Sequence, residues 1–321
     1  MQNYSLVIHG GAGTILKEDM TPELEATYLS GLQNALDSGY AVLEEGGLAT
    51  NAIKAAIVIL EDNLLFNAGR GSVFTKKGVQ EMDAAIMNGK DLAAGAVAGV
   101  RNVRNPIVLA AEVMQHSDHV LLSGEGANDF AVRHGIKLEP DEYFFSQFRY
   151  DQWKAMRDSD NYSLDHTQAA LEAIMNPDSY RDKKFGTVGA VACDKDGNIA
   201  AATSTGGMTN KKYGRIGDTP LIGCGTYANN KTCAISCTGH GEPFIRAVAA
   251  YDVSCLVEYK GMSLQQAMDE VVNKKLVAID GEGGMIGVDA AGNCAMLFNS
   301  AGMYRGMRNS SGVSFIGIYK D

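Results

Sequence analysis

The stretch 185-FGTVGAVACDKDGNIAAATSTGG-207 contains the clearest structural pattern in this chain. Two runs of mostly small and β-branched residues, Thr187–Cys193 and Ile199–Thr205, flank the turn-forming segment Asp194–Asn198. This pattern predicts two antiparallel strands joined by a tight turn. Small side chains along both strands let another backbone approach closely. Hydroxyl groups and glycines gather at the open end of the predicted hairpin, so we interpret that end as a candidate site.

The rest of the chain mixes helical and strand-like segments. Thr21-Pro22 and the capping box of Ser263 and Gln266 mark two helix starts. Helices are expected near residues 22–46, 50–62, 105–113, 124–132, 167–175, 245–249 and 263–275. Short apolar stretches that fit strands occur at residues 5–9, 82–87, 93–100, 120–122, 220–227, 232–237, 285–288 and 294–298. Antiparallel sheets covered by helices, a layered α+β arrangement, fit this order better than repeated βαβ units.

Composition narrows the range of partners. The net charge of −10 disfavours nucleic acid and anionic membranes as partners, and no apolar run is long enough to span a bilayer. The start of the chain lacks a basic region followed by an apolar core, so we expect no secretory signal and a cytoplasmic location. The six cysteines lie in the second half without zinc-like spacing, which favours buried thiols in a reduced compartment.

Several common functional motifs are incomplete or missing in this sequence. The segment Asp194–Asn198 resembles the start of a calcium loop, but its glycine comes two places early and Thr205 stands where a glutamate is needed. The chain has no complete dinucleotide fingerprint, phosphate-loop lysine or Gly-x-Ser-x-Gly elbow. The histidines are not at metal-binding spacing, and a structural role is the simpler interpretation of His9.

Thr187 allows two interpretations. Threonine favours strands, so the residue can simply open the first strand of the hairpin. A threonine hydroxyl is otherwise a weak nucleophile, but a free α-amine on the same residue can serve as its base. Such an amine has a pKa of about 8 in model compounds. Freeing it requires a cut between Gly186 and Thr187, and composition alone leaves both interpretations open.

Short motifs spread over nearly the whole chain point to a known protein family. They occur at residues 9–13 (HGGAG), 60–69, 82–84 (MDA), 95–100 (GAVAGV), 186–192 (GTVGAVA), 201–207 (AATSTGG), 214–218 (GRIGD) and 236–239 (SCTG). In this order the chain resembles the plant-type L-asparaginase / isoaspartyl aminopeptidase family of N-terminal nucleophile (Ntn) hydrolases. The resemblance implies a four-layer αββα sandwich and a small-molecule substrate, and no cofactor for catalysis.

The resemblance also implies roles for individual residues. Thr187 would be the nucleophile, Thr205 would orient it and Asn67 would support that end of the pocket. Thr238 and Gly239 would form the oxyanion hole. The substrate α-carboxylate would bind to Arg215 in a two-pronged contact, and its α-ammonium to Asp218 and the carbonyl of Gly241. His240 departs from the family pattern and would shape the preference for a leaving group.

Processing and assembly follow from the same resemblance. A precursor would cut itself before Thr187 into an α chain, residues 1–186, and a β chain, residues 187–321, which together form one domain. The polar segment 143–186 is expected to be a mobile linker before the cut. Two processed pairs would form an (αβ)2 dimer. A structural sodium ion would bind the backbone carbonyls of Leu60, Glu61, Asn63, Phe66, Ala68 and Arg70.

The expected activity is hydrolysis of isoaspartyl dipeptides and of L-asparagine. One rival is a glycosylasparaginase-like enzyme of the same superfamily. It is disfavoured by the sequence His9–Gly13 and by glycine, where that enzyme has aspartate, before the nucleophile. A second rival is a non-catalytic small-molecule binding protein that stays as one chain. Self-cleavage before Thr187 distinguishes the enzymes from the binding protein.

Overall fold

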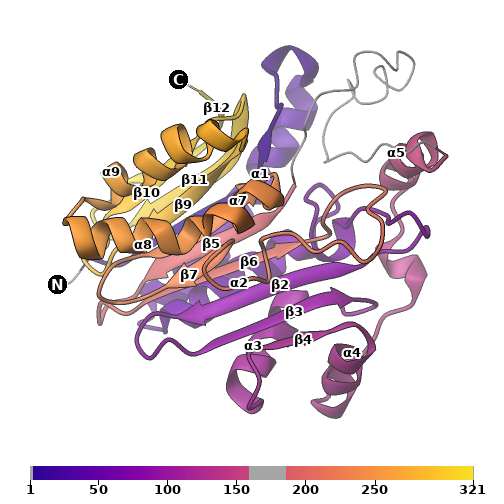
Figure 1. The fold of residues 1–321 in the computed structure, drawn as a ribbon, viewed down its shortest axis with the longest axis horizontal. Helices are drawn as coiled ribbons and strands as arrows, with labels where there is room; N and C mark the ends of the chain where they lie inside the picture. The colour runs from indigo at the N-terminus through magenta and orange to yellow at the C-terminus, as the bar shows by residue number, and fades with distance from the viewer. Residues whose placement is uncertain (1–2, 159–185, 321) are drawn as a thin grey trace.

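A computed structural model describes residues 3–158 and 186–320, and Figure 1 shows their arrangement. The helices are α1 (Pro22–Glu44), α2 (Ala49–Glu61), α3 (Pro106–His116), α4 (Gly124–Arg133), α5 (Gln147–Met156), α7 (Gly241–Ala247), α8 (Ala249–Lys260) and α9 (Leu264–Asp269). The strands are β1 (Ser5–Gly13), β2 (Met82–Asn88), β3 (Ala94–Val100), β4 (Leu121–Ser123), β5 (Val188–Cys193), β6 (Ile199–Thr205), β7 (Thr226–Ala228), β8 (Ala234–Gly239), β9 (Gly283–Val288), β10 (Cys294–Phe298), β11 (Gly302–Asn309) and β12 (Ser314–Tyr319).

The strands form two sheets. The larger has eight strands in the order β12-β11-β1-β5-β6-β2-β3-β4, and the smaller has four in the order β10-β9-β8-β7. All neighbours are antiparallel except β3 and β4. The predicted hairpin is confirmed as β5–β6, which pairs from Val188 opposite Ser204 to Cys193 opposite Ile199. It lies at the centre of the larger sheet.

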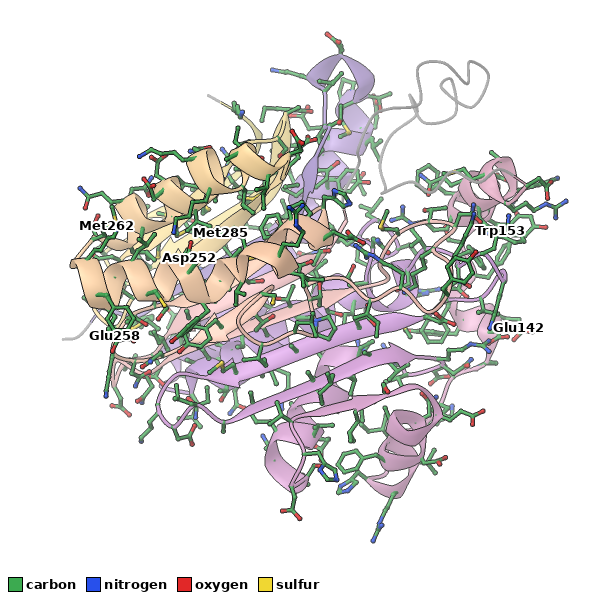
Figure 2. All side chains as sticks on the ribbon, viewed as in Figure 1. Glu142, Trp153, Asp252, Glu258, Met262 and Met285 are labelled. Atoms are coloured by element: carbon green, nitrogen blue, oxygen red, sulfur yellow. The ribbon has the colours of Figure 1, made fainter. Side chains whose placement is uncertain are left out.

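Apolar residues fill three interfaces between layers. One buried cluster joins α1, α2 and α3 to the larger sheet, a second lies between the two sheets, and a third lies under α8 and α9. Figure 2 labels Met285 of β9, which belongs to this third cluster. Helices therefore cover both outer faces of a pair of stacked sheets. The predicted αββα sandwich is confirmed.

The predicted helix starts are also confirmed. The Thr21 hydroxyl accepts a hydrogen bond from the backbone N–H of Leu24, and proline occupies the first turn of α1. At α9 the Ser263 side chain and the Gln266 side chain each bond to the other residue's backbone. Both arrangements satisfy N–H groups that have no partner within the helix.

Three local predictions differ from the structure. Residues 220–227 were expected to be a strand, but only Thr226–Ala228 is one, because turns with a positive φ at Gly223 precede it. The helix expected to run through Val248 is broken there into α7 and α8, where Val248 has a φ of 49°. The final hairpin, β11–β12, was not predicted; β11 pairs with β1, which lies almost 300 residues earlier.

The predicted linker begins too early. Residues 143–158 include the helix α5, and its Arg149 side chain is buried. The guanidinium of Arg149 donates to the carbonyl oxygens of Gly71 at 3.0 Å and Leu65 at 3.2 Å. Figure 2 labels Trp153 on the same helix. Residues 159–185, with the helix predicted near 167–175 and most of the linker, lie outside the described residues.

Within residues 3–158 and 186–320, no helix combines the length and the apolar character that crossing a bilayer requires.

Candidate functional site

The open end of the β5–β6 hairpin brings two threonines together. Thr187 stands immediately before β5 and Thr205 is the last residue of β6, so antiparallel pairing places them side by side. The Thr187 hydroxyl donates to the Thr205 hydroxyl at 3.1 Å. Both side chains are buried. The hairpin register therefore forms the pair that the sequence predicted.

The same hydroxyls surround the peptide bond before Thr187. The carbonyl oxygen of Gly186 accepts hydrogen bonds from the Thr205 hydroxyl at 3.1 Å and from the Asn67 side-chain amide at 3.0 Å. The Thr205 oxygen also accepts from the backbone N–H of Gly207 at 3.0 Å. Thr205 thus donates its one proton to Gly186 and presents lone pairs to Thr187. Two donors polarise the carbonyl of the predicted cleavage site.

His9 holds Thr187 from the opposite side. Its Nδ1 lies 3.0 Å from the carbonyl oxygen of Thr187, and its Nε2 lies 2.9 Å from the Ser236 hydroxyl. A carbonyl only accepts, so Nδ1 carries the hydrogen and Nε2 accepts from Ser236. Burial lowers the pKa of His9 to about 3, although the bond to Thr187 opposes that shift. The imidazole is therefore neutral, and it ties the two sheets together behind the predicted nucleophile.

Two hydroxyls of β6 had no role assigned from sequence. The Ser204 hydroxyl donates to the buried Glu61 carboxyl at 2.6 Å, which connects β6 to the end of α2. Burial raises the pKa of Glu61 to about 8, while hydrogen bonds from Ser204 and the Ile107 N–H act against the rise. Thr203 lies 2.7 Å from the Ser236 hydroxyl that contacts His9. Both residues fix the strand that carries Thr205.

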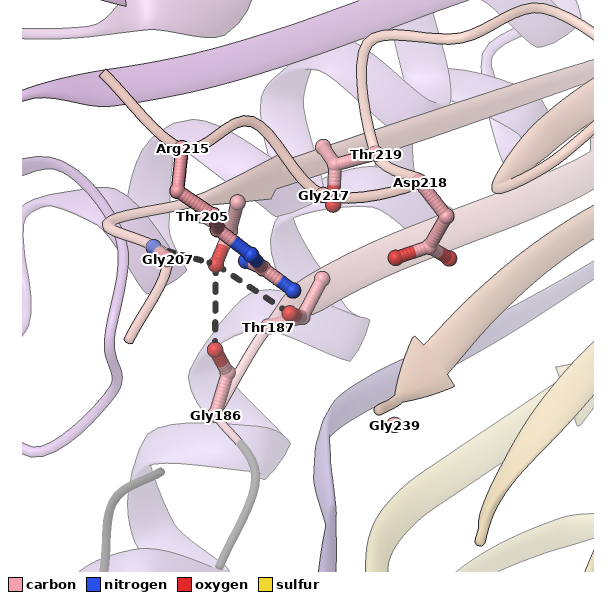
Figure 3. A pocket seen from close by; sticks show the side chains of 9 residues that line it. All are labelled: Gly186, Thr187, Thr205, Gly207, Arg215, Gly217, Asp218, Thr219 and Gly239. Carbon is pink, nitrogen blue, oxygen red and sulfur yellow. Dashed lines mark hydrogen bonds between the residues drawn. The ribbon is translucent and has the colours of Figure 1, made fainter. Parts of the chain in front are cut away.

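A charged pair lines the other side of the site. Figure 3 shows Arg215 and Asp218 facing the space beside Thr187. Asp218 is buried, and within the described part of the chain its Oδ2 atom has no hydrogen-bond partner. Burial raises the pKa of Asp218 to about 6, although the positive charge of Arg215 opposes this. A side chain added at Gly241 would come within 3.0 Å of both residues, so this glycine lets them approach the site.

Glu242 is a residue that the sequence reasoning missed. Its carboxylate accepts two hydrogen bonds from Arg215, at 2.9 and 2.8 Å, and lies 3.1 Å from Nε2 of His240. Although burial opposes ionisation, the bonds from His240 and Arg215 hold the pKa of Glu242 well below its usual range. One edge of the Arg215 guanidinium is therefore already occupied. Nothing in the sequence indicated this pairing, because Arg215 and Glu242 lie 27 residues apart and the contact joins a loop to the first turn of α7.

The predicted oxyanion-hole residues end β8. Gly239 lines the pocket together with Thr187, and the neighbouring Thr238 is buried. The Thr238 oxygen accepts from the backbone N–H of Ala12 at 3.2 Å, so its own proton points elsewhere. At Gly239 an added side chain would lie 2.4 Å from the Glu282 carbonyl oxygen, which explains the glycine.

The predicted site residues therefore converge on one pocket. It is lined by Gly186, Thr187, Thr205, Gly207, Arg215, Gly217, Asp218, Thr219 and Gly239. Figure 3 shows the hydroxyls of Thr187 and Thr205 on one side and Asp218 on the other. A hydroxyl pair, a cation and an anion in one pocket can bind an α-amino acid and attack a carbonyl attached to it. Asn67, Thr238 and Gly241 are not among these lining residues, but each lies next to one of them. Asn67 donates to the Gly186 and Gly207 carbonyls, Thr238 precedes Gly239, and Gly241 lies against Asp218.

The loop predicted to bind sodium packs its backbone closely at two glycines. A side chain added at Gly71 would lie 2.1 Å from the carbonyl oxygen of Phe66 and 3.0 Å from that of Asn63. A side chain at Gly69 would lie 2.6 Å from the Glu61 carbonyl oxygen. These glycines let carbonyl oxygens crowd together in the loop, and such oxygens suit hard cations. The crowding includes three of the six predicted ligands.

Comparisons with known proteins agree with this geometry. A family model described as asparaginase matches residues 2–318. The chain belongs to the asparaginase family. It is 48% identical over 321 residues to the isoaspartyl peptidase of Salmonella typhimurium, covering 100% of both chains. It is 47% identical to the isoaspartyl peptidase of Escherichia coli, covering 98% of this chain and 96% of the relative. The plant-type L-asparaginase of Pyrococcus horikoshii is 43% identical, covering 93% and 94%.

Membership of the asparaginase family confirms the predicted resemblance and identifies the chain as an enzyme, a hydrolase. It counts against the rival interpretation as a non-catalytic binding protein. A small molecule is the substrate expected of such an enzyme, and the pocket at Thr187 is where it would bind.

Proposed function

We propose that this protein is a threonine-nucleophile amidohydrolase that cleaves isoaspartyl dipeptides and L-asparagine after cutting itself between Gly186 and Thr187. The observation that carries the proposal is the pocket that combines the Thr187–Thr205 hydroxyl pair with Arg215 and Asp218. The names of the similar enzymes, isoaspartyl peptidase and plant-type L-asparaginase, support the same activity.

Self-cleavage is the first step of the proposal. The Thr187 oxygen attacks the Gly186 carbonyl carbon, the bond from that carbon to the Thr187 nitrogen breaks, and an ester forms. Water then hydrolyses the ester and leaves a carboxylate on Gly186 and a free amine on Thr187. Asn67 and Thr205 donate to the carbonyl oxygen on which negative charge develops. Thr205 also accepts the hydrogen bond from the attacking hydroxyl.

Substrate hydrolysis uses the new chain start. The amine of Thr187 accepts the hydroxyl proton as the oxygen attacks the side-chain carbonyl of an aspartyl unit, and the leaving amine takes a proton as it departs. Thr238 and the N–H of Gly239 stabilise the oxyanion. The acyl group on Thr187 is then released by water as aspartate.

Recognition of the aspartyl unit depends on the charged pair. Asp218 attracts the substrate α-ammonium through the carboxylate oxygen that has no partner in the described structure, and the carbonyl of Gly241 assists it. Arg215 binds the α-carboxylate with the edge of its guanidinium that Glu242 leaves open. The two-pronged contact expected from sequence therefore uses the two terminal nitrogens of Arg215, or requires Glu242 to move.

A structural sodium ion belongs to the proposal. The backbone carbonyls of Leu60, Glu61, Asn63, Phe66, Ala68 and Arg70 would hold it. The ion would fix the shape of the loop that contains Asn67 and would supply no chemistry. No cofactor is proposed for catalysis. The (αβ)2 assembly, the division into chains 1–186 and 187–321, and the cytoplasmic location also stay predictions.

A panel of substrates tests the proposed activity. Purified protein is assayed with a β-aspartyl dipeptide, L-asparagine, the matching α-aspartyl dipeptide and β-aspartyl-N-acetylglucosamine. We expect hydrolysis of the first two and none of the α-linked dipeptide, because attack requires the carbonyl on the β-carbon side. Thr187→Ala should abolish every activity, whereas Thr187→Ser should retain part of it.

Two results would contradict the proposal. Undiminished dipeptide cleavage by Thr187→Ala would exclude Thr187 as the nucleophile. Turnover of β-aspartyl-N-acetylglucosamine equal to that of the dipeptide would favour the glycosylasparaginase-like rival.

A further inference from the structure

A cluster of three possible metal ligands lies away from the catalytic pocket. Glu112 and His116 are one turn apart on α3, and His134 follows the last residue of α4. Both helices lie beside β3 and β4 at the edge of the larger sheet (Figure 1). One ligand atom from each side chain lies within 4.8 Å of the other two. No step of the proposed hydrolysis uses these residues.

Both histidines direct the same kind of atom to one carboxylate oxygen. Nδ1 of His116 lies 2.8 Å and Nδ1 of His134 lies 4.0 Å from Oε2 of Glu112. A glutamate and a histidine four residues apart on a helix form an ordinary surface pair. The third group is what distinguishes this cluster, because His134 comes from a different helix.

Packing holds His134 in place. Its backbone N–H donates to the carbonyl oxygen of Phe130 at 3.0 Å, and its ring stacks on the Phe130 ring with centroids 4.1 Å apart. The His134 ring also stacks on the His116 ring, at a centroid distance of 5.7 Å. A fixed ring loses little rotational freedom when its nitrogen binds a ligand.

We propose that Glu112, His116 and His134 bind one divalent transition-metal ion, with zinc the best fit. Two imidazole nitrogens and one carboxylate oxygen form a ligand set that zinc uses, and water would complete the tetrahedron. Tetrahedral bonds of about 2.1 Å separate two ligand atoms by about 3.4 Å. The distance of 2.8 Å must therefore open, and that of 4.0 Å must close, by about 0.6 Å each. The two histidine nitrogens, which lie within 4.8 Å of each other, must also come to about 3.4 Å.

The proposed site would join two helices and leave the chemistry unchanged. The His116 side chain is 52% exposed, while those of Glu112 and His134 are 28% and 26% exposed. An ion could therefore reach the ligands from solvent and would be partly shielded from it once bound. An ion that binds only the folded protein raises its stability in proportion to the logarithm of ion concentration over Kd. Zinc should therefore stabilise the link between α3 and α4.

The test uses tag-free full-length protein that has been stripped of metal with a chelator and dialysed. Zinc affinity is measured by competition with a chromophoric chelator, and cobalt(II) is added separately to record its visible spectrum. We expect one zinc ion per chain with a Kd at or below about 1 µM, and cobalt bands of tetrahedral intensity. His116→Asn and His134→Phe should each weaken zinc binding at least tenfold; phenylalanine keeps a ring beside Phe130.

His119→Asn is the matched control, because His119 is exposed and lies just beyond α3. It should bind zinc as the unmodified protein does. Zinc should raise the melting temperature of the unmodified protein and of His119→Asn, and of neither ligand variant. All four proteins should hydrolyse a β-aspartyl dipeptide equally without zinc, so this result is independent of the proposed function. No zinc binding below about 100 µM, or equal binding after both ligand substitutions, would overturn the proposal.

Discussion

Two hairpins of this protein share a turn and differ at their open ends. In β5–β6 the side chain of Asp194 accepts hydrogen bonds from two backbone N–H groups of the turn, and Asp289 does the same in β9–β10. Gly197 and Gly292 occupy equivalent positions, with φ of 79° and 81°. The repeated Asp-x-x-Gly-Asn pattern therefore specifies one turn geometry and the strand register that follows from it.

The open ends have different tasks. In β5–β6 the pair at this end is Thr187 and Thr205, which share a hydroxyl–hydroxyl hydrogen bond beside the Gly186 carbonyl. In β9–β10 the backbone N–H of Gly283 donates to the Asn299 side chain at 2.8 Å, which closes the end without exposing a reactive group. The turn determines pairing, whereas the residues one strand-length away determine chemistry.

The second hairpin nevertheless supports the first. Gly283 lies opposite Gly239 in the β8–β9 register. A side chain added at Gly283 would lie 2.3 Å from the Thr238 carbonyl oxygen. The open end of β9–β10 thus sets the position of the proposed oxyanion hole, and the open end of β5–β6 holds the proposed nucleophile.

Among substitutions that test this comparison, Thr205→Val should have the largest effect, because in residues 3–158 and 186–320 it removes the one hydroxyl that bonds to both Thr187 and the Gly186 carbonyl. Losing such a donor typically slows a reaction by about 10²–10³-fold. We expect self-cleavage, followed by gel densitometry after synthesis, to slow by roughly this factor. Thr205→Ser keeps the hydroxyl and should process within about tenfold of the unmodified protein. Equal processing rates for valine and threonine would remove Thr205 from the mechanism.

Asp218→Asn should follow, with a loss of about 10–100-fold in kcat/KM for L-asparagine, the range of one charge-assisted hydrogen bond. Because burial raises the pKa of Asp218 to about 6, the carboxylate becomes protonated as pH falls through that value. KM for an ammonium-bearing substrate should therefore rise below pH 6 in the unmodified enzyme. The asparagine variant should lack this rise.

The raised pKa also affects stability. Between about pH 4 and 6 the folded protein holds a proton on Asp218 that the unfolded chain has released. The contribution of this group to the free energy of unfolding therefore falls as the pH rises from about 4 to 6.

Asp252→Asn is the control for the kinetic effect of Asp218→Asn, since Asp252 pairs with Lys275 on the outer helical layer. It should leave kcat/KM and its pH profile unchanged.

Asn299→Ala tests the contribution of the second hairpin. It removes the bond to Gly283 and the two bonds that the Asn299 amide donates to the carbonyl oxygens of Val272 and Gly281, and should let the Gly239 segment shift. We expect kcat/KM to fall by about tenfold, with the rate of self-cleavage unchanged. Impaired self-cleavage with normal kcat/KM would reverse the roles assigned to the two open ends.

The turn glycines should affect stability alone. Gly197→Ala and Gly292→Ala place a side chain at a positive φ, which costs about 1–2 kcal/mol. Gly292→Ala should cost more than this backbone strain alone, since its Cβ would lie 2.7 Å from the carbonyl oxygen of Asn3. Denaturant unfolding measures both values, and kcat/KM should stay within about twofold of the unmodified enzyme. Equal activity losses in both variants would show that turn geometry reaches the site.

Local sequence signals predicted the parts of the fold that local chemistry determines. The caps at Thr21 and Ser263 and the β5–β6 turn are fixed by neighbouring residues, and all three are confirmed. The pairing of β11 with β1 joins opposite ends of the chain, and nothing near Gly302 indicates its partner. The break in the helix at Val248 was missed for a different reason: valine rarely adopts a positive φ, so its presence does not indicate a helix end.

The site also contains residues that the sequence predicted and contacts that it did not. Thr187, Thr205, Arg215 and Asp218 belong to recognisable motifs, and the structure places them in one pocket. Their catalytic roles stay predictions. Glu242 was missed because its contact with Arg215 joins a loop to the first turn of α7, 27 residues further along the chain. Nor did the sequence reveal that His9 contacts the Thr187 carbonyl, because that contact depends on how β1 pairs with β5.

The most direct test of the central claim is the intact mass and N-terminal sequence of the purified protein after prolonged incubation. The account predicts two fragments, one of which begins Thr-Val-Gly-Ala-Val, and a single uncut chain for Thr187→Ala. An uncut chain that hydrolyses β-aspartyl dipeptides, or a cut at any other peptide bond in the active protein, would contradict it.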